Sequence, residues 1–280
     1  MQSNNYAYVN GRFVPEAEAT VSIFDRGFLY GDGVFETMRV YDGQVFRLHE
    51  HLVRLFDALA HFKIESPLPA EELRTVCNVL VERNQVRNGF ARVYATSGRN
   101  QLGATTVSQH GASLVATAGP IEFESPQLRL IISSVRLDPA LSRFKTANRL
   151  PYITARREAE RAGASEAVLL NAAGRVAELS TSNLFVVKAG ELFTPSATEG
   201  PLPGITRDVV LTLAGEMLLP THEAMLGLQS LENADELFAT NSLMEIVPVI
   251  QFKDRVLAKG SVTERLENAY REFVRQELDL

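Results

Sequence analysis

The sequence predicts a mixed α/β protein with two domains. β-prone runs recur along the chain, segments with helical periodicity separate them, and residues 119–126 (GPIEFESP) have the composition of a linker. A chain of 280 residues is long enough for one large or two medium domains. We therefore expect an N-terminal α/β domain over residues 1–118, a linker over residues 119–126 and a C-terminal domain over residues 127–280.

The N-terminal half combines strands with two helices. Its first two strands flank Asn10-Gly11, a dipeptide typical of a hairpin turn. Gly31 and Gly33 lead into a strand and lack the remaining glycines of a phosphate loop, so we predict no nucleotide site there. The predicted elements are strands over residues 6–10, 12–14, 34–41 and 45–48, helices from Arg47 and over residues 71–85, and strands over residues 91–96 and 112–118.

The C-terminal half begins with a strand and reaches Lys145 through a loop. Pro151 stands where a helix can start, and Gly163 closes that helix. Ser261 and Glu264 have the spacing of a capping box for the last helix. The predicted strands cover residues 128–133, 168–171, 176–180, 184–187, 192–194, 236–240 and 246–251, and a further helix follows Gly204.

The composition is that of an ordinary globular protein. Apolar residues make up 45% and charged residues 22% of the chain. The formal net charge of −6 argues against a nucleic-acid partner. The N-terminus lacks the pattern of a signal peptide and no apolar run approaches about 18 residues, so we expect a cytoplasmic protein with no membrane partner. Cys77 is the only cysteine, which excludes an intramolecular disulfide and a cysteine metal site, and we expect no metal.

The segment from Lys145 to Glu178 has a pattern that suits a cofactor. A lysine precedes a helix, and a glutamate follows 33 residues later in a hairpin, where strand alternation places Val176, Glu178 and Ser180 on one face. Such a pair can hold pyridoxal phosphate, because the lysine amine bonds to the aldehyde and the carboxylate faces the pyridine nitrogen. The alternative is a solvated lysine and a glutamate that pairs with Arg175.

A turn at Gly204 delivers the chain into a helix whose first free amides belong to Ile205 and Thr206. A helix N-terminus favours anions, and a phosphate suits it. Arg54 lies off the leucine stripe of its own helix, so periodicity alone predicts a solvent-exposed arginine.

Along essentially its whole length the chain resembles the class IV aminotransferase family, the fold-type IV pyridoxal-phosphate enzymes. The matching motifs stand in family order: VNGRFV, FDRGFLYGDGVFETMRVYDG, HLVRL around Arg54, FK at Lys145, EAVLLNAAGRVAELSTSNLF, LPGITRD and DELFATNSLMEIVPV. Seven motifs in one order are far more specific than any single motif.

This resemblance implies a role for individual residues. Lys145 is the Schiff-base lysine and proton shuttle, and Glu178 is the partner of the pyridine nitrogen. The phosphate would be held by Arg54, the backbone amides of Ile205 and Thr206, and the Ser242 hydroxyl. The resemblance also implies two α/β domains with pyridoxal 5′-phosphate between them, residues 127–280 being the cofactor-binding domain, and a homodimer whose partner subunit contributes to each site.

The implied activity is ping-pong transfer of an amino group between an amino acid or primary amine and a 2-oxo acid. The chain departs from the branched-chain enzymes at Thr37, at Leu150 and in the run from Asn241 to Ile246, and from the D-amino-acid enzymes at Arg99, which falls one place late. Thr37, Asn148-Arg149-Leu150 and the Asn-x-Leu-Met run resemble aminodeoxychorismate lyase instead, which eliminates pyruvate to give 4-aminobenzoate. That lyase reaction is the alternative function.

The substrate pocket is predicted from the same comparison. Its candidate residues are Phe28, Tyr30, Phe35, Thr37, Arg92 and Arg99, with the loop over residues 97–111. Core packing is the alternative role for each aromatic side chain, and a surface position is the alternative for Arg92.

Overall fold

The computed structural model describes residues 5–100, 111–122 and 127–280. By its internal contacts the chain divides into two units. Unit 1 comprises Met1–Glu122 with Lys145–Asn148, and unit 2 comprises Phe123–Phe144 with Arg149–Leu280.

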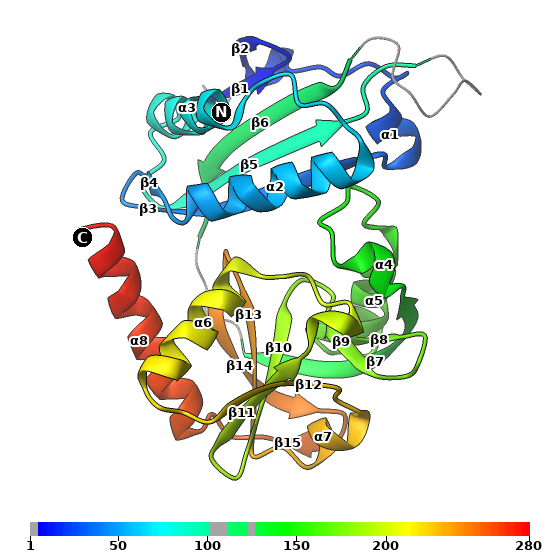
Figure 1. Cartoon of the computed structure of the whole chain (residues 1–280), viewed down its shortest axis with the longest axis vertical. Coiled ribbons are helices and arrows are strands. Elements are labelled where there is room, and N and C mark those ends of the chain that lie inside the picture. The colour runs from blue at the N-terminus through cyan, green and yellow to red at the C-terminus, as the bar shows by residue number, and fades with distance from the viewer. Residues whose placement is uncertain (1–4, 101–110, 123–126) are drawn as a thin grey trace. The chain divides into compact units, whose positions relative to one another are not determined.

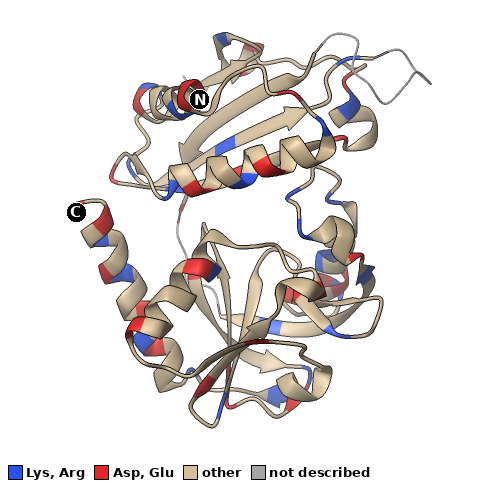
Figure 2. Cartoon of the chain, in the orientation of Figure 1, with Lys and Arg blue, Asp and Glu red and all other residues tan. Residues whose placement is uncertain are grey.

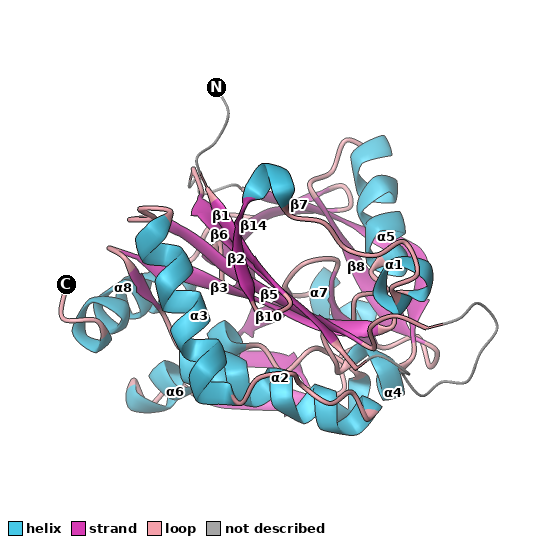
Figure 3. Ribbon diagram, turned by 90° about the horizontal axis from the view of Figure 1, so that it is seen from above, coloured by secondary structure: helices cyan, strands magenta, loops and turns pink. Residues whose placement is uncertain are grey.

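Unit 1 contains a six-stranded sheet among its described residues, with the order β2-β1-β6-β5-β3-β4. The helices α2 and α3 lie on the same side of this sheet (Figures 1 and 3). Its elements are β1 (Tyr6–Val9), β2 (Arg12–Pro15), η1 (Glu16–Glu18), α1 (Arg26–Tyr30), β3 (Gly33–Tyr41), β4 (Gln44–Val45), α2 (Leu48–Phe62), α3 (Ala70–Arg83), β5 (Gly89–Thr96) and β6 (Ser113–Pro120).

Three features of unit 1 differ from the sequence prediction. The helix α1 was not expected; the Asp25 side chain caps it by accepting a hydrogen bond from the Gly27 amide. The strand expected over residues 45–48 ends at Val45, because α2 already begins at Leu48. The strand β6 continues through Pro120, so the first two residues of the expected linker lie in the sheet, while residues 123–126 are outside the described residues.

Lys145 belongs to unit 1, although the boundary expected from the sequence placed it in the second domain. The segment Lys145–Asn148 lies along β3. The Phe35 amide donates to the Lys145 carbonyl at 2.9 Å, and the Ala147 amide donates to the Gly33 carbonyl at 2.8 Å. These backbone hydrogen bonds tie the lysine to a strand far from it in sequence.

The strand β3 divides its side chains between the two faces of the sheet. Val34, Glu36 and Met38 face α2, and each is at most 1% exposed. Phe35 and Thr37 lie on the opposite face, where their cross-strand neighbours on β5 are Tyr94 and Arg92. On the side of β3 that faces α2, the charged Glu36 therefore stands between two apolar residues, Val34 and Met38.

Unit 2 contains a nine-stranded sheet among its described residues, ordered β12-β11-β10-β13-β14-β7-β8-β9, with β15 paired to β14. The helix α5 packs on β7 and β8, and α6 and α8 pack together near β13. Its elements are β7 (Leu128–Leu137), α4 (Pro139–Ser142), α5 (Leu150–Arg161), β8 (Glu166–Asn171), β9 (Val176–Leu179), β10 (Asn183–Lys188), β11 (Glu191–Pro195), η2 (Ala197–Glu199), α6 (Ile205–Glu216), β12 (Thr221–Ala224), α7 (Leu228–Glu232), β13 (Glu236–Asn241), β14 (Glu245–Phe252), β15 (Arg255–Val256) and α8 (Ser261–Glu277).

The hairpin of β8 and β9 contains a bulge that the sequence did not reveal. Leu169 pairs with Glu178, but Leu170 pairs with Val176, so Ala177 is an extra residue on β9. Val176 and Leu179 consequently enter the same apolar core, whereas simple alternation predicted opposite faces for them. The prediction that Val176 shares the face of Glu178 is therefore wrong.

The start of α8 is also capped differently from the prediction. Gly260 is the N-cap residue, and no side chain of the first turn caps the helix. The Glu236 carboxylate accepts hydrogen bonds from the Val262 and Thr263 amides at 3.1 and 2.8 Å instead. A carboxylate from β13 thus replaces the expected capping box.

Acidic and basic residues are interspersed along α2 and α8 (Figure 2). Within residues 5–100, 111–122 and 127–280, no helix is both long and apolar enough to cross a membrane.

Candidate active site

Lys145 lies over an aromatic ring. Its ammonium nitrogen is 4.9 Å from the centroid of Phe35, and the Lys145 backbone is held against the same strand. Phe35 stacks on Tyr94, with ring centroids 4.9 Å apart. Phe35 is buried as the core-packing alternative predicts, but its ring also forms the surface on which the lysine rests.

Arg92 lies beside this lysine-bearing surface. Its guanidinium is 5.0 Å from the Phe35 centroid and 5.2 Å from that of Tyr94. The Arg92 Nε atom is buried with no hydrogen-bond partner among the described residues, and the same is true of the Thr37 hydroxyl opposite it. Buried polar groups of this kind need a partner, so the surface is suited to an anionic ligand.

Arg54 is not the solvent-exposed arginine that its helix suggested. Its Nε and Nη2 atoms donate to the two oxygens of Glu36, each at 2.7 Å, and only 13% of its side chain is exposed. His51, one turn earlier on α2, is hydrogen-bonded through Nδ1 to Glu36 at 2.8 Å. The bidentate ion pair fixes the plane of the guanidinium.

The electrostatics of this cluster favour a charged pair and a neutral ring. Burial alone would raise the pKa of Glu36, but the Arg54 guanidinium and His51 outweigh it and hold that pKa well below its ordinary value. Burial lowers the pKa of His51, and the hydrogen bond to Glu36 offsets only part of this effect. A neutral His51 donates from Nδ1, because the carboxylate can only accept.

Glu178 lies in β9 and is 4% exposed. Its carboxylate accepts a hydrogen bond from the Leu202 amide at 3.0 Å. The alternative partner Arg175 donates to Glu199 at 2.5 Å instead. The chain between Leu202 and Gly204 therefore connects Glu178 with the start of α6.

Tyr152 provides a second neighbour for Glu178. Burial, and next the Glu178 carboxylate, raise the pKa of the Tyr152 hydroxyl. The Arg149 guanidinium lies 3.4 Å from the centre of the Tyr152 ring. Among the described residues the hydroxyl has no partner with hydrogen-bond geometry, although it lies beside the carboxylate.

The helix α6 begins at Ile205 with Gly204 as its N-cap, and no side chain caps it. A Cβ atom at Gly204 would lie 2.0 Å from Asn183 Oδ1, so a larger residue here would displace the Asn183 side chain. Ile205 and Thr206 are both largely buried. This N-terminus retains the character of an anion site.

Ser242 is half-buried in the turn between β13 and β14. The side-chain oxygen of Asn241 shapes that turn by accepting hydrogen bonds from the Leu243 and Met244 amides at 3.0 and 2.8 Å. Unit 2 thus contains Glu178, the α6 N-terminus and the Ser242 turn, whereas Lys145, Arg54 and Arg92 are in unit 1.

The remaining pocket candidates are exposed. Phe28 is 69% and Tyr30 is 55% exposed, so core packing is the wrong role for these two aromatics. Arg99 is exposed, and its backbone bridges to that of Asp25. Most of the predicted pocket loop, residues 101–110, lies outside the described residues.

The family model for class IV amino-transferases matches residues 33–252 of this chain, which contain the lysine, the two buried glutamates and the α6 N-terminus. The chain belongs to the class IV aminotransferase family. This membership confirms the family predicted from the seven motifs.

Relatives of this aminotransferase carry different activities in their names. The chain is 39% identical to a putative branched-chain-amino-acid aminotransferase of Methanocaldococcus jannaschii, over 95% of both chains. It is 32% identical to a D-alanine aminotransferase of Bacillus licheniformis, over 96% of both chains. An aminodeoxychorismate lyase of Bacillus subtilis is also 32% identical, over 96% of this chain and 94% of the lyase.

Solved structures agree with the fold. The branched-chain aminotransferase of Thermoproteus uzoniensis with norvaline gives a TM-score of 0.91 at 32% identity, covering 96% of this chain and 94% of the other. A further branched-chain aminotransferase, solved with pyridoxamine 5′-phosphate, gives the same TM-score at 31% identity, covering 98% of this chain and 95% of the other. The predicted α/β class, fold type IV, is confirmed.

Sequence analysis of this aminotransferase missed several residues around the candidate site. Glu36 and His51 surround Arg54, and Tyr152 lies beside Glu178. One signal was present: Glu36 interrupts an apolar strand face, and His51 and Arg54 are three residues apart on one helix face. The Leu202 amide had no signal, since any residue type supplies a backbone N–H.

Proposed function

We propose that this chain is a pyridoxal 5′-phosphate-dependent aminotransferase that moves an amino group between an amino acid or primary amine and a 2-oxo acid by a ping-pong mechanism. The observation that supports it most is Lys145, whose backbone is bonded to β3 and whose ammonium lies over Phe35 beside Arg92. A lysine amine and an anion-binding arginine on one surface suit an amino-acid substrate.

The residues present fit the cofactor of this family, pyridoxal 5′-phosphate. The N-terminus of α6, which no side chain caps, suits a phosphate. The Ile205 and Thr206 amides, the Ser242 hydroxyl and the Arg54 guanidinium would hold it. The buried Glu178 carboxylate suits a protonated ring nitrogen.

When bound, the cofactor supplies a protonated pyridine ring that accepts the electron pair released at the substrate α-carbon. Lys145 would hold the cofactor covalently, and its free amine would be the base that takes up and returns the proton of the substrate α-carbon. Glu178 would keep the ring nitrogen protonated by accepting its hydrogen bond.

Arg92 and Thr37 are proposed to bind the substrate carboxylate. They are direct cross-strand neighbours, and the Arg92 Nε and the Thr37 hydroxyl have no hydrogen-bond partner among the described residues. A carboxylate can accept from both donors at once. Loss of Arg92 is therefore expected to raise KM more than it lowers kcat.

The second candidate is 4-amino-4-deoxychorismate lyase. The relative of that name is as similar in sequence as the D-alanine aminotransferase. Thr37 and the Asn241-Ser242-Leu243-Met244 run also resemble the lyases. Both activities would use Lys145 and Glu178 in the same roles.

A homodimer is proposed as the working form. Exposed apolar side chains gather within a short segment of unit 1, at Ile23, Phe24, Phe28 and Tyr30, with exposures from 44% to 69%. A second copy of this chain is expected to cover them. Analytical ultracentrifugation should give twice the chain mass of 30.9 kDa, and a monomer would contradict this.

A spectrophotometric half-reaction tests the function. The purified protein, loaded with pyridoxal 5′-phosphate, is mixed separately with L-amino acids, D-amino acids, primary amines and aminodeoxychorismate. We expect the visible cofactor band to disappear with one equivalent of oxo product. Release of pyruvate and 4-aminobenzoate with the band restored would establish the lyase, and no reaction with any of them would contradict both candidates.

A further inference from the structure

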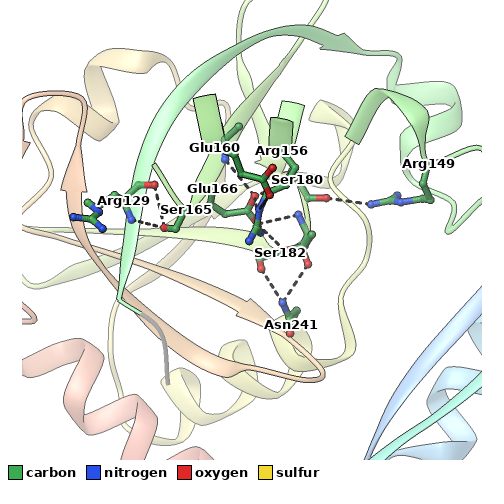
Figure 4. Close-up of polar contacts among 11 residues, drawn as sticks. Arg129, Arg149, Arg156, Glu160, Ser165, Glu166, Ser180, Ser182 and Asn241 are labelled. Carbon is green, nitrogen blue, oxygen red and sulfur yellow. Dashed lines mark hydrogen bonds and ion pairs between the residues drawn. The ribbon is translucent and has the colours of Figure 1, made fainter. Parts of the chain in front are cut away.

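The side chain of Asn241 connects two turns of unit 2 that are far apart in sequence. Its amide nitrogen donates to the Ser182 hydroxyl at 2.9 Å and to the Thr181 carbonyl at 3.3 Å. Its amide oxygen accepts from the Leu243 and Met244 backbone amides. All four contacts come from one short side chain, and Figure 4 shows those to the turn at Ser182.

The orientation of this amide is fixed by its partners. Backbone N–H groups can only donate, so the Asn241 oxygen must face Leu243 and Met244. The Thr181 carbonyl can only accept, so the nitrogen must face that turn. A flipped amide would lose three of the four contacts.

The turn that Asn241 reaches is itself held firmly. The buried Glu166 carboxylate accepts from the Ser180 hydroxyl and from the Thr181 amide, the latter at 3.1 Å. From the other side, Arg149 donates to the Ser180 carbonyl at 3.2 Å. Figure 4 shows Glu166, Ser180, Ser182 and Asn241 together. Asn241 is therefore anchored to a rigid part of the unit.

The two connected turns belong to the two ends of the candidate cofactor site. Ser180 follows Glu178 by two residues, at the end of β9. Ser242 directly follows Asn241 in the other turn. One turn is thus adjacent to the carboxylate proposed for the ring nitrogen, and the other contains a hydroxyl proposed for the phosphate.

We propose that Asn241 is a positioning residue that fixes the Ser242 turn relative to the strand of Glu178. This inference rests on the proposed function. The ring nitrogen and the phosphate belong to one small molecule, so the groups that bind them must keep a fixed separation. Without the Asn241 side chain the Ser242 turn loses both its internal support and its connection to Ser182.

The test uses the full-length Asn241→Ala, Ser182→Ala and double variants. Each is titrated with pyridoxal 5′-phosphate and with pyridoxal, which lacks the phosphate. The matched control is Ser165→Ala, since the Ser165 hydroxyl also joins two segments of unit 2, through both backbone groups of Arg129 (Figure 4). Visible circular dichroism of the bound cofactor reports its orientation.

Each single variant should weaken pyridoxal 5′-phosphate binding by about 3- to 10-fold, the size of one lost hydrogen bond. The double variant should be no weaker than Asn241→Ala, because both changes remove the same connection. Pyridoxal affinity should stay unchanged, and the dichroism of the bound phosphate cofactor should change. Ser165→Ala should behave as wild type.

Equal losses for both cofactors, additive effects in the double variant, or a Ser182→Ala variant that matches wild type would overturn the inference. Ser182→Ala tests the connection from its other end if Asn241→Ala fails to fold. A wild-type protein that binds neither cofactor would instead overturn the proposed function, and the inference with it.

Discussion

Two buried glutamates, one in each unit, have different kinds of hydrogen-bond partner. Glu36 faces a full positive charge, since Arg54 binds both of its oxygens and His51 binds one of them. Glu178 accepts from a neutral backbone amide and lies beside the phenol of Tyr152. Both are strand residues that are at most 4% exposed.

This difference separates two uses of a buried carboxylate. An ion pair inside the fold balances its own charge and fixes an arginine, so Glu36 is a positioning group for Arg54. Glu178 accepts a hydrogen bond from the Leu202 backbone amide, and its negative charge can stabilise a protonated ligand. The comparison predicts stability effects at Glu36 and catalytic effects at Glu178.

The largest loss of activity should follow substitution of Lys145, because the role proposed for Glu178 depends on a cofactor that Lys145 binds. Lys145→Ala should lower turnover by about 10⁴-fold, the upper end of the range for a positioned proton-transfer group. Stability should be retained, because the Lys145 side chain is half-buried and its backbone hydrogen bonds to β3 do not need it. Steady-state kinetics and thermal unfolding check this; undiminished turnover would rule out the lysine assignment.

Glu178→Gln should lower kcat by about 10²- to 10³-fold, as for the loss of one electrostatic stabiliser. The Gln side chain can still accept from the Leu202 amide, so the fold should be unaffected. The measurement is single-turnover kinetics with a reactive amino donor. If the Glu178→Gln variant lost stability but kept its rate, Glu178 would have a structural role like that of Glu36, and the contrast between the two glutamates would be wrong.

Glu36→Gln should lower the free energy of unfolding by about 3 kcal/mol, because it leaves Arg54 without its anionic partner in a largely buried position. Its effect on kcat at saturating cofactor should be much smaller than that of Glu178→Gln. Denaturant unfolding measures the first quantity. The matched control is Glu264→Gln, an exposed glutamate on α8.

The lowered pKa values of Glu36 and His51 predict acid sensitivity. Both native pKa values lie below those of the unfolded chain, so the stabilising contributions are present above the unfolded pKa and are lost as the pH falls. The contribution of His51 to stability is lost as the pH falls below about 6.5, and that of Glu36 as it falls below about 4.5, which are the ordinary pKa values of the two side chains. In His51→Gln the loss of stability between pH 6.5 and 5 should be smaller than in wild type, as measured by denaturant unfolding across this range. Identical pH profiles would contradict a buried neutral His51.

Tyr152→Phe should have the smallest effect on stability, within about 1 kcal/mol, because the hydroxyl has no hydrogen-bond partner in the described parts of the chain. The Arg149 stacking on the ring would persist. Thermal unfolding measures the change. A loss well above that size would show that the phenol supports Glu178 through a hydrogen bond.

Local patterns predicted most of the elements, because strand alternation, helical period and turn residues depend on neighbours in sequence. The hairpin around Gly174 and the helix after Gly204 appear where these signals placed them. Local signals failed where a residue distant in sequence makes the contact expected of a nearby one. Glu236 on β13 caps α8, whereas the sequence predicted a cap from residues in the first turn of α8.

The sequence by itself determined the family and the helix that starts at Ile205, and it marked Lys145 and Glu178 as site candidates by residue type and order. Only the tertiary structure decided that Lys145 packs with unit 1, that Arg54 is held by Glu36, and that Asn241 connects two turns. These contacts join residues far apart in sequence through backbone groups or common polar side chains. Their partners follow from the packing of sheets and helices, which no local pattern specifies.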